Sequence, residues 1–97
     1  MDCKVILSPR AIQDLSEIVR YISLDNPQAA ERFGFTLIDA ALSLGTLPER
    51  GRLVPEFTDG TRELIYGRYR IIYRIRPDSK TVWVSRFWHA QRGIPEI

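Results

Sequence analysis

The sequence has little of the chemistry that builds metal or cofactor sites. Its 97 residues include one cysteine, Cys3, and one histidine, His89. A single cysteine cannot form an internal disulfide and fits a reducing compartment. The chain has no CxxC motif, no paired histidines, no phosphate-cradling glycine loop and no nucleophile elbow. We therefore predict no metal, no cofactor and no serine or cysteine triad.

Long apolar runs are also missing. No segment approaches the ~18 consecutive apolar residues that a membrane span needs. The opening residues 1–7 lack the basic stretch, apolar stretch and cleavage site of an export signal. A chain of 97 residues is long enough for one hydrophobic core and too short for two. The sequence thus predicts one cytoplasmic domain over residues 1–97, with no membrane contact.

Positive charge is concentrated in the second half of the chain. Residues 1–49 carry four basic side chains against seven acidic ones, and residues 50–97 carry ten basic against five acidic. Arginine supplies nearly all of the later charge, and its planar fork suits carboxylate or phosphate groups. The second half is where an acidic partner or a nucleic acid would dock. The alternative interpretation is that these arginines only keep a two-sided sheet soluble.

Two helix-start signals, each a polar capping residue followed by proline, divide the first half of the chain into a strand and two helices. Residues 3–7 are rich in β-formers and predict a strand. Ser8 and Pro9 then form a cap and first helical residue, followed by an apolar stripe at helical spacing through about residue 24. The same signal recurs at 25–27, and a second stripe runs to Gly45, a natural C-terminal cap. We expect an antiparallel helical hairpin over residues 9–24 and 27–45.

Three β-rich stretches follow a loop over residues 48–60. They cover 61–66, 69–76 and 81–88 and are joined by tight turns, which require antiparallel pairing. The order β-α-α-β-β-β predicts an α+β fold of two layers, in which the hairpin packs on one face of a curved antiparallel sheet. The residues expected in the core where helices meet sheet are Leu15, Ile18, Phe33 and Leu37.

Alternation along residues 69–76 separates two faces of the sheet. Tyr and Ile occupy the odd positions, and arginine occupies three of the four even ones. The last strand alternates less cleanly, and a bulge near residues 85–86 would explain that. We expect the odd positions to face the helices. The other face would then be an open, concave, basic surface that shows Arg70, Arg74 and one of Arg86 or His89.

Metal-free RNA cleavage is the one reaction that these side chains could support. It needs a base for the 2′-hydroxyl, cations for the phosphate and an acid for the leaving oxygen. Arg70, His89 and Arg92 could fill those roles, with Glu49 or Glu56 from the preceding loop. The blander alternative is that His89 is a structural hydrogen-bonding residue and that the two tryptophans are core or interface bulk.

Several short motifs in order resemble the RelE/ParE toxins of type II toxin–antitoxin systems. They span nearly the whole chain and read Leu7-Ser8-Pro9-Arg10-Ala11, Pro27-Gln28-Ala29-Ala30, Arg62-Glu63-Leu64, Tyr69-Arg70-Ile71-Ile72-Tyr73-Arg74 and His89-Ala90-Gln91-Arg92. The resemblance implies a helical hairpin on a curved sheet and a protein toxin silenced by a cognate antitoxin, whose acidic, amphipathic segment wraps it. It also implies one of two targets, because RelE-like members cut messenger RNA on the ribosome and ParE-like members poison DNA gyrase.

The ending of the chain favours the second target. His89-Ala90-Gln91-Arg92 resembles the His-Gly-Arg-Arg ending of ParE-like members, although alanine replaces the usual glycine. Arg70 matches an arginine that nuclease members use on phosphate, so Arg70, His89 and Arg92 are the catalytic candidates if the chain is a nuclease. We expect a gyrase inhibitor, with ribosome-dependent cleavage of messenger RNA as the alternative. The expected partner-binding residues are Arg62, Arg70, Arg74, Arg86, Trp88, Gln91 and Arg92.

Overall fold

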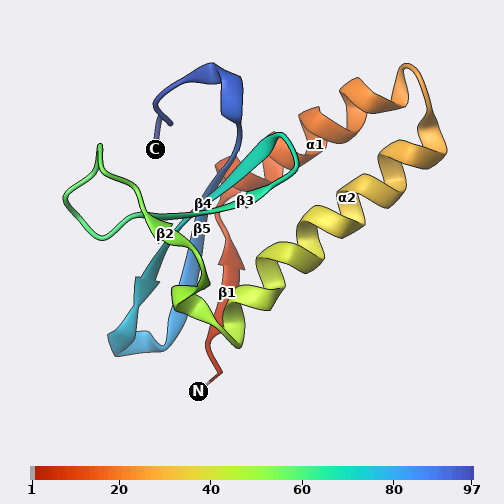
Figure 1. The fold of residues 1–97 in the computed structure, drawn as a ribbon. Coiled ribbons are helices and arrows are strands. Elements are labelled where there is room, and N and C mark those ends of the chain that lie inside the picture. Colours follow the sequence, from red (N-terminus) through yellow and green to blue (C-terminus); the bar gives the residue numbers. More distant parts are fainter. Residues whose placement is uncertain (1) are drawn as a thin grey trace.

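Two helices cover one face of a five-stranded sheet in the computed structural model, which describes residues 2–97. The strand order across the sheet is β1-β5-β4-β3-β2 (Figure 1). The elements are β1 (Lys4–Leu7), α1 (Pro9–Ser23), α2 (Pro27–Leu42), β2 (Arg52–Leu53), β3 (Arg62–Tyr66), β4 (Tyr69–Arg76) and β5 (Thr81–His89). The two-layer α+β fold expected from the sequence is confirmed. No helix in the described range has the length and apolar character needed to cross a membrane.

Both helices begin where the helix-start signals predict. The Ser8 side chain accepts a hydrogen bond from the backbone N–H of Ala11 at 3.0 Å, and Asn26 accepts one from Ala29 at 3.1 Å. Each cap is followed by a proline, whose missing N–H has no partner to lose at that position. The hairpin bounds are therefore set by local sequence, and α2 continues into a short 3-10 turn that ends at Gly45.

Gly45 has a different role from the cap predicted for it. A Cβ at this position would lie 2.7 Å from the backbone oxygen of Cys3. The Gly45 carbonyl also accepts a hydrogen bond from the Cys3 N–H at 2.6 Å. Glycine is needed here because the backbone before β1 approaches the end of the hairpin closely.

The sheet is mixed, which corrects the expectation of a fully antiparallel one. β3, β4 and β5 pair antiparallel as predicted, whereas β1 pairs parallel with β5 from Lys4↔Thr81 to Leu7↔Val84. A parallel pair requires a long connection, and the chain between these two strands contains both helices and the rest of the sheet. The tight turns between β3, β4 and β5 predict only the antiparallel pairs, so they could not predict the parallel pairing of β1 with β5.

The bulge expected in the last strand is present at Ser85. Ile72 pairs with Arg86 and Tyr73 with Val84, so Ser85 has no partner on β4. The extra residue inverts the alternation along β5. Val82 and Val84 face the helices before the bulge, and Phe87 does so after it.

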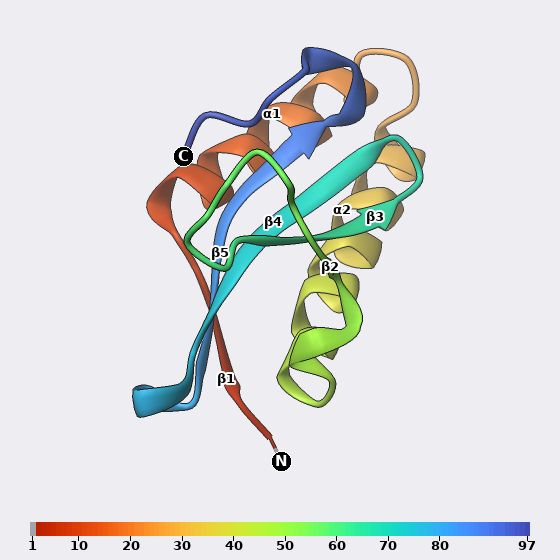
Figure 2. The same ribbon diagram turned by 60° about the vertical axis from the view of Figure 1, so that its left-hand side comes forward.

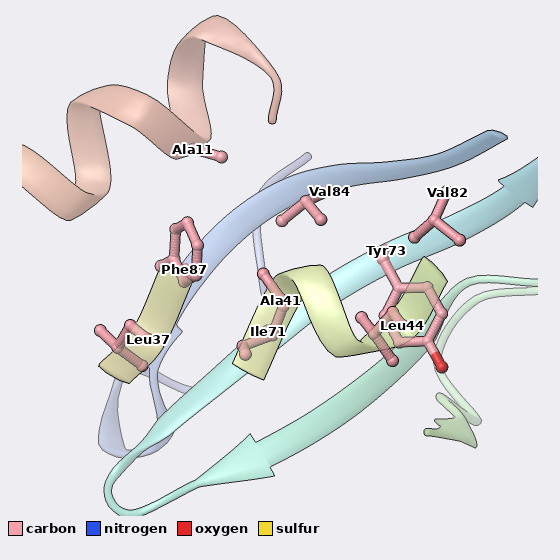
Figure 3. Packing of buried hydrophobic residues seen from close by; sticks show 9 residues of the cluster. All are labelled: Ala11, Leu37, Ala41, Leu44, Ile71, Tyr73, Val82, Val84 and Phe87. Atoms are coloured by element: carbon pink, nitrogen blue, oxygen red, sulfur yellow. The ribbon is translucent and has the colours of Figure 1, made fainter. Parts of the chain in front are cut away.

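The core lies between the helices and the sheet (Figure 3). Leu37 is fully buried there, as predicted, while Leu15, Ile18 and Phe33 pack against the core and keep part of their surface exposed. The buried cluster draws on α1, α2, β4 and β5 and consists of Ala11, Leu37, Ala41, Leu44, Ile71, Tyr73, Val82, Val84 and Phe87. The odd positions of β4 therefore face the helices, as the alternation predicts.

Part of the second face of the sheet is covered, although the sequence pattern predicts an open face, while Arg74 and Arg76 on this face are exposed. Ile72 on this face is fully buried. The segment after β5 crosses the face, because the carbonyl of Gly93 accepts hydrogen bonds from Arg70 and Trp88, and that of Glu96 accepts one from Arg86. Figure 2 shows this segment turning back toward the start of α1.

Candidate functional site

A buried carboxylate organises the arginines of β2 and β4. The side chain of Glu63 on β3 is fully buried, and it pairs with Arg70 and, at 2.6 Å, with Arg52. A buried charge is tolerated only when it is paired and hydrogen-bonded. Arg70 is 15% exposed in its side chain and also donates to the Gly93 carbonyl at 3.0 Å. Its charge is therefore compensated within the protein.

A second buried pair joins α1 to β5. Arg86 contacts Asp14 through two parallel hydrogen bonds of 2.7 and 2.8 Å, and Asp14 also accepts the N–H of Phe87 at 3.1 Å. Both side chains are at most 8% exposed. The hydrogen bonds to Asp14 raise the pKa of Arg86 above its ordinary value, against the effect of burial. The expectation that Arg86 lies on an open docking surface is wrong, because Asp14 draws it inward.

The ring of Trp88 contacts two guanidinium groups. The Arg86 guanidinium carbon is 4.8 Å from the centre of the Trp88 ring, and that of Arg92 is 4.1 Å from it. The indole N–H donates to the Gly93 carbonyl at 3.2 Å, and the residue is 2% exposed. Trp88 is thus buried instead of presented to a partner, and it holds Arg92 at the surface through a cation–π contact.

Arg70 and His89 lie on opposite faces of the sheet. Tyr69 pairs with His89 and Arg70 with Trp88, so alternation turns Arg70 and Trp88 to the covered second face and His89 to the helix side. The His89 ring stands edge-on to Tyr69 at 5.1 Å between centroids, and its Nδ1 accepts the N–H of Gln91 at 3.1 Å. Two of the residues that nuclease chemistry would need together are separated by the sheet.

The remaining predicted site residues are spread around the second half of the chain. Arg62 is half-buried and donates to the Gly51 carbonyl at 2.7 Å. The Arg74 side chain is 44% exposed and lies 3.7 Å from Asp59. Gln91 is exposed beside Arg92, and the two loop carboxylates considered as bases, Glu49 and Glu56, are also exposed.

Asp14 was not identified from the sequence as the partner of Arg86, although its position in the helix is a signal for such a role. It occupies the same helical face as Ala11 and Ile18, where an apolar residue is expected. A charged residue at such a position requires a buried partner of opposite charge.

Among residues 2–97, no group of three histidine, cysteine, aspartate or glutamate side chains is placed to hold a metal ion.

Comparison with known proteins gives consistent matches over almost the whole chain. Residues 5–94 match the family model described as the ParE toxin of the type II toxin–antitoxin system parDE. Toxin RelE1 of Caulobacter vibrioides is 36% identical over 92 residues, which cover 92% of this chain and 95% of the relative. Toxin RelE2 of the same organism is 38% identical over 89 residues, which cover 92% and 97%.

Two solved structures share the fold. The toxin–antitoxin complex RelBE2 from Mycobacterium tuberculosis aligns with a TM-score of 0.72 and 25% identity, covering 92% of this chain and 99% of the matched chain. The chromosomal ParDE system from P. aeruginosa aligns with a TM-score of 0.73 and 19% identity, covering 90% and 95%. The second likeness concerns the fold alone.

Proposed function

The chain belongs to the ParE toxin family of type II toxin–antitoxin systems, and from that premise we propose that it stops growth by inhibiting DNA gyrase. A cognate antitoxin holds it silent until it is released. The inhibition is non-enzymatic and depends on binding. The exposed residues Gln91 and Arg92, after β5, supply polar contacts to gyrase from one end of the sheet.

The separation of Arg70 from His89 carries the choice of target. Cleavage of RNA without a metal needs the phosphate-stabilising cation and the proton-transfer group within reach of one phosphodiester. Here the sheet lies between them, and Arg70 is paired with the buried Glu63. An arginine whose charge is already paired with a carboxylate stabilises the developing negative charge of a transition state less strongly.

The alternative function is ribosome-dependent cleavage of messenger RNA. It is favoured by one finding, which is that the curated relatives from Caulobacter vibrioides carry the name RelE. In that case Arg70, His89 and Arg92 would have to converge on ribosome-bound message, and Arg70 would have to leave Glu63. The gyrase proposal needs no such rearrangement.

Antitoxin binding is supported by exposed apolar side chains on the hairpin and β3 and by an exposed arginine on β4. Phe35 and Ile12 on the hairpin are 61% and 55% exposed, and Ile65 on β3 is 56% exposed. Arg74 adds an exposed positive charge on β4. An amphipathic segment with carboxylates could cover both kinds of side chain. The solved relative from Mycobacterium tuberculosis is described as a toxin–antitoxin complex.

Supercoiling by purified gyrase tests the proposal. The chain should inhibit supercoiling of relaxed plasmid in proportion to its concentration, and addition of its cognate antitoxin should restore the activity. A reconstituted translation reaction with the same concentrations serves as the control and should proceed normally. Arrested translation with undiminished supercoiling would reverse the choice between the two targets.

A further inference from the structure

A cavity of about 450 Å³ lies between α1 and the ends of β4 and β5, beside the buried pair of Asp14 and Arg86. Figure 1 shows α1 rising beside the end of the sheet where β5 passes into the chain's last residues. Such a volume is within the range of small-ligand sites. Ile18 and Phe87 supply apolar surface, and polar side chains come from both walls.

The sheet wall supplies positioned donors. Arg92 is held over the Trp88 ring, and Trp88 is itself fixed by its hydrogen bond to Gly93. Nδ1 of His89 accepts the N–H of Gln91, which places the hydrogen of the neutral ring on Nε2. Burial raises the pKa of Tyr69, whose hydroxyl therefore stays protonated as a further donor. These groups can receive an anion.

The helix wall supplies a carboxylate. Glu17 lies one turn before Tyr21 on α1, so both side chains line the cavity. Its one hydrogen bond within residues 2–97 is a long contact of 3.4 Å from Gln13. Asp14 also lines the cavity, but both its oxygens are engaged by Arg86. Glu17 is thus the carboxylate with capacity left for a ligand.

Opposite charges on facing walls restrict what the cavity can bind. Arg92 favours an anionic group at one wall, and Glu17 favours a cation or N–H donors at the other. A ligand that carries an anionic group at one end and paired N–H donors at the other satisfies both walls. Exposed Tyr21 offers a ring face for a planar group between the two ends.

We propose that this cavity binds a guanine nucleotide, with the base edge on Glu17, the ring against Tyr21 and the phosphate on Arg92 and His89. Guanine presents two adjacent donors, N1–H and the N2 amino group, which match the two oxygens of a carboxylate. Adenine and cytosine offer one amino donor beside a ring acceptor, and uracil offers one N–H between two carbonyls. Each of these would place an acceptor against Glu17. The proposal is one of binding and goes beyond gyrase inhibition. Arg70 lies on the other face of the sheet, so a phosphate held by Arg92 and His89 would lack the arginine that cleavage needs.

Calorimetric titration of the purified chain with GMP and AMP tests the base preference. GMP should bind about tenfold tighter than AMP or more, the discrimination typical of a bidentate contact to a base. Glu17→Gln should abolish that preference, whereas Glu31→Gln, an equal loss of charge outside the cavity, should retain it. Equal affinities for GMP and AMP in the parent chain would overturn the proposal.

The phosphate contact has its own variant and readout. Arg92→Ala should reduce GMP binding to the level of guanosine, and Arg20→Ala on the exposed side of α1 should not. The indole N–H signal of Trp88 should shift in a nuclear magnetic resonance titration with GMP. That of Trp83 provides an internal reference because it stacks on Arg76, away from the cavity. Shifts confined to Trp83, or GMP affinity unaffected by Arg92→Ala, would contradict the placement.

The nucleotide could be free or the end of a nucleic acid strand, and a third titration separates these sources. A single-stranded oligonucleotide with a 5′-phosphorylated guanine should match GMP if the free nucleotide is the ligand, and should bind at least tenfold tighter if a strand end is. Failure of all guanine ligands to bind at millimolar concentration, with gyrase still inhibited, would remove the nucleotide proposal and leave the proposed function intact.

Discussion

Asp14 and Glu63 carry negative charge into the interior, and each is neutralised by an arginine on the sheet. Breaking a buried pair costs far more than the pair contributes, because one charge is then left without compensation. Asp14 also accepts the N–H of Phe87, so it fixes both a side chain and the backbone of β5. These contacts hold Trp88 and, through it, Arg92 in place.

Asp14→Ala should therefore destabilise the chain strongly. Arg86 would remain buried without its carboxylate, and we expect a loss of about 3–5 kcal/mol in the free energy of unfolding. Urea denaturation followed by circular dichroism measures this loss. Asp39→Ala, on the exposed side of α2, is the matched control and should change stability by less than about 0.5 kcal/mol. Equal effects of the two variants would contradict the role given to the buried pair.

Tyr73 is a second residue whose polar atom is fixed in the interior. Its hydroxyl accepts the N–H of Gly51 at 2.8 Å and donates to the Pro48 carbonyl at 2.7 Å. Tyr73→Phe should cost about 1–3 kcal/mol, because the buried Gly51 N–H loses its acceptor. Thermal denaturation of parent and variant measures the difference, and Tyr21→Phe at an exposed position should be neutral.

The burial of Tyr73 also predicts that the stability of the chain depends on pH in the alkaline range. Burial raises the pKa of Tyr73 above its ordinary 10.0, so the folded state keeps the phenol neutral longer than the unfolded state does. The stability that Tyr73 contributes is complete below that ordinary value and is lost as pH rises through the raised pKa of the folded chain. Tyr73→Phe should lose less stability than the parent over this range.

At the scale of elements, aromatic contacts help to join the hairpin to the sheet. Phe33 on α2 contacts the rings of Tyr66 and Tyr69, with centroids 6.2 and 5.6 Å away. Because Phe33 is only partly buried, Phe33→Ala should cost about 2–3 kcal/mol, below the range for a fully buried phenylalanine. Chemical denaturation tests this, and a variant that unfolds with the parent would remove the aromatic contact from the account.

Gly45→Ala tests the contact between the end of the hairpin and β1. The added methyl group would meet the Cys3 carbonyl, which is backbone and cannot rotate away. We expect a loss of about 1–3 kcal/mol in the free energy of unfolding. Thr46→Ala, one residue later and exposed, is the control. A neutral Gly45→Ala variant would show that the strand shifts without cost.

Local signals predicted the elements well, and long-range pairing accounts for what they missed. The caps at Ser8 and Asn26 and the alternation along β4 depend on residues close in sequence, so they could be read directly. The parallel pairing of β1 and the bond between Asp14 and Arg86 join residues more than 70 positions apart. Strand alternation places Arg86 on the second face, but it cannot show that residues after β5 cover part of that face.

For the whole molecule, the positive charge of the second half of the chain is only partly available at the surface after folding. Two of the arginines expected on an open surface are compensated by buried carboxylates, and Arg74 remains exposed. Arg74→Glu should weaken antitoxin binding and make the remaining affinity less sensitive to salt. Lys80→Glu, which changes the net charge equally in an exposed turn, is the control. Equal losses of affinity in both variants would assign the effect to net charge alone.

The most direct test of the account concerns message bound to the ribosome, because the separation of Arg70 from His89 argues against RNA cleavage. Primer extension on ribosome-bound message should reveal intact transcripts after incubation with the parent chain, at concentrations that inhibit gyrase. Cleavage in the ribosomal A site by the parent chain, lost in Arg70→Ala, would contradict the account.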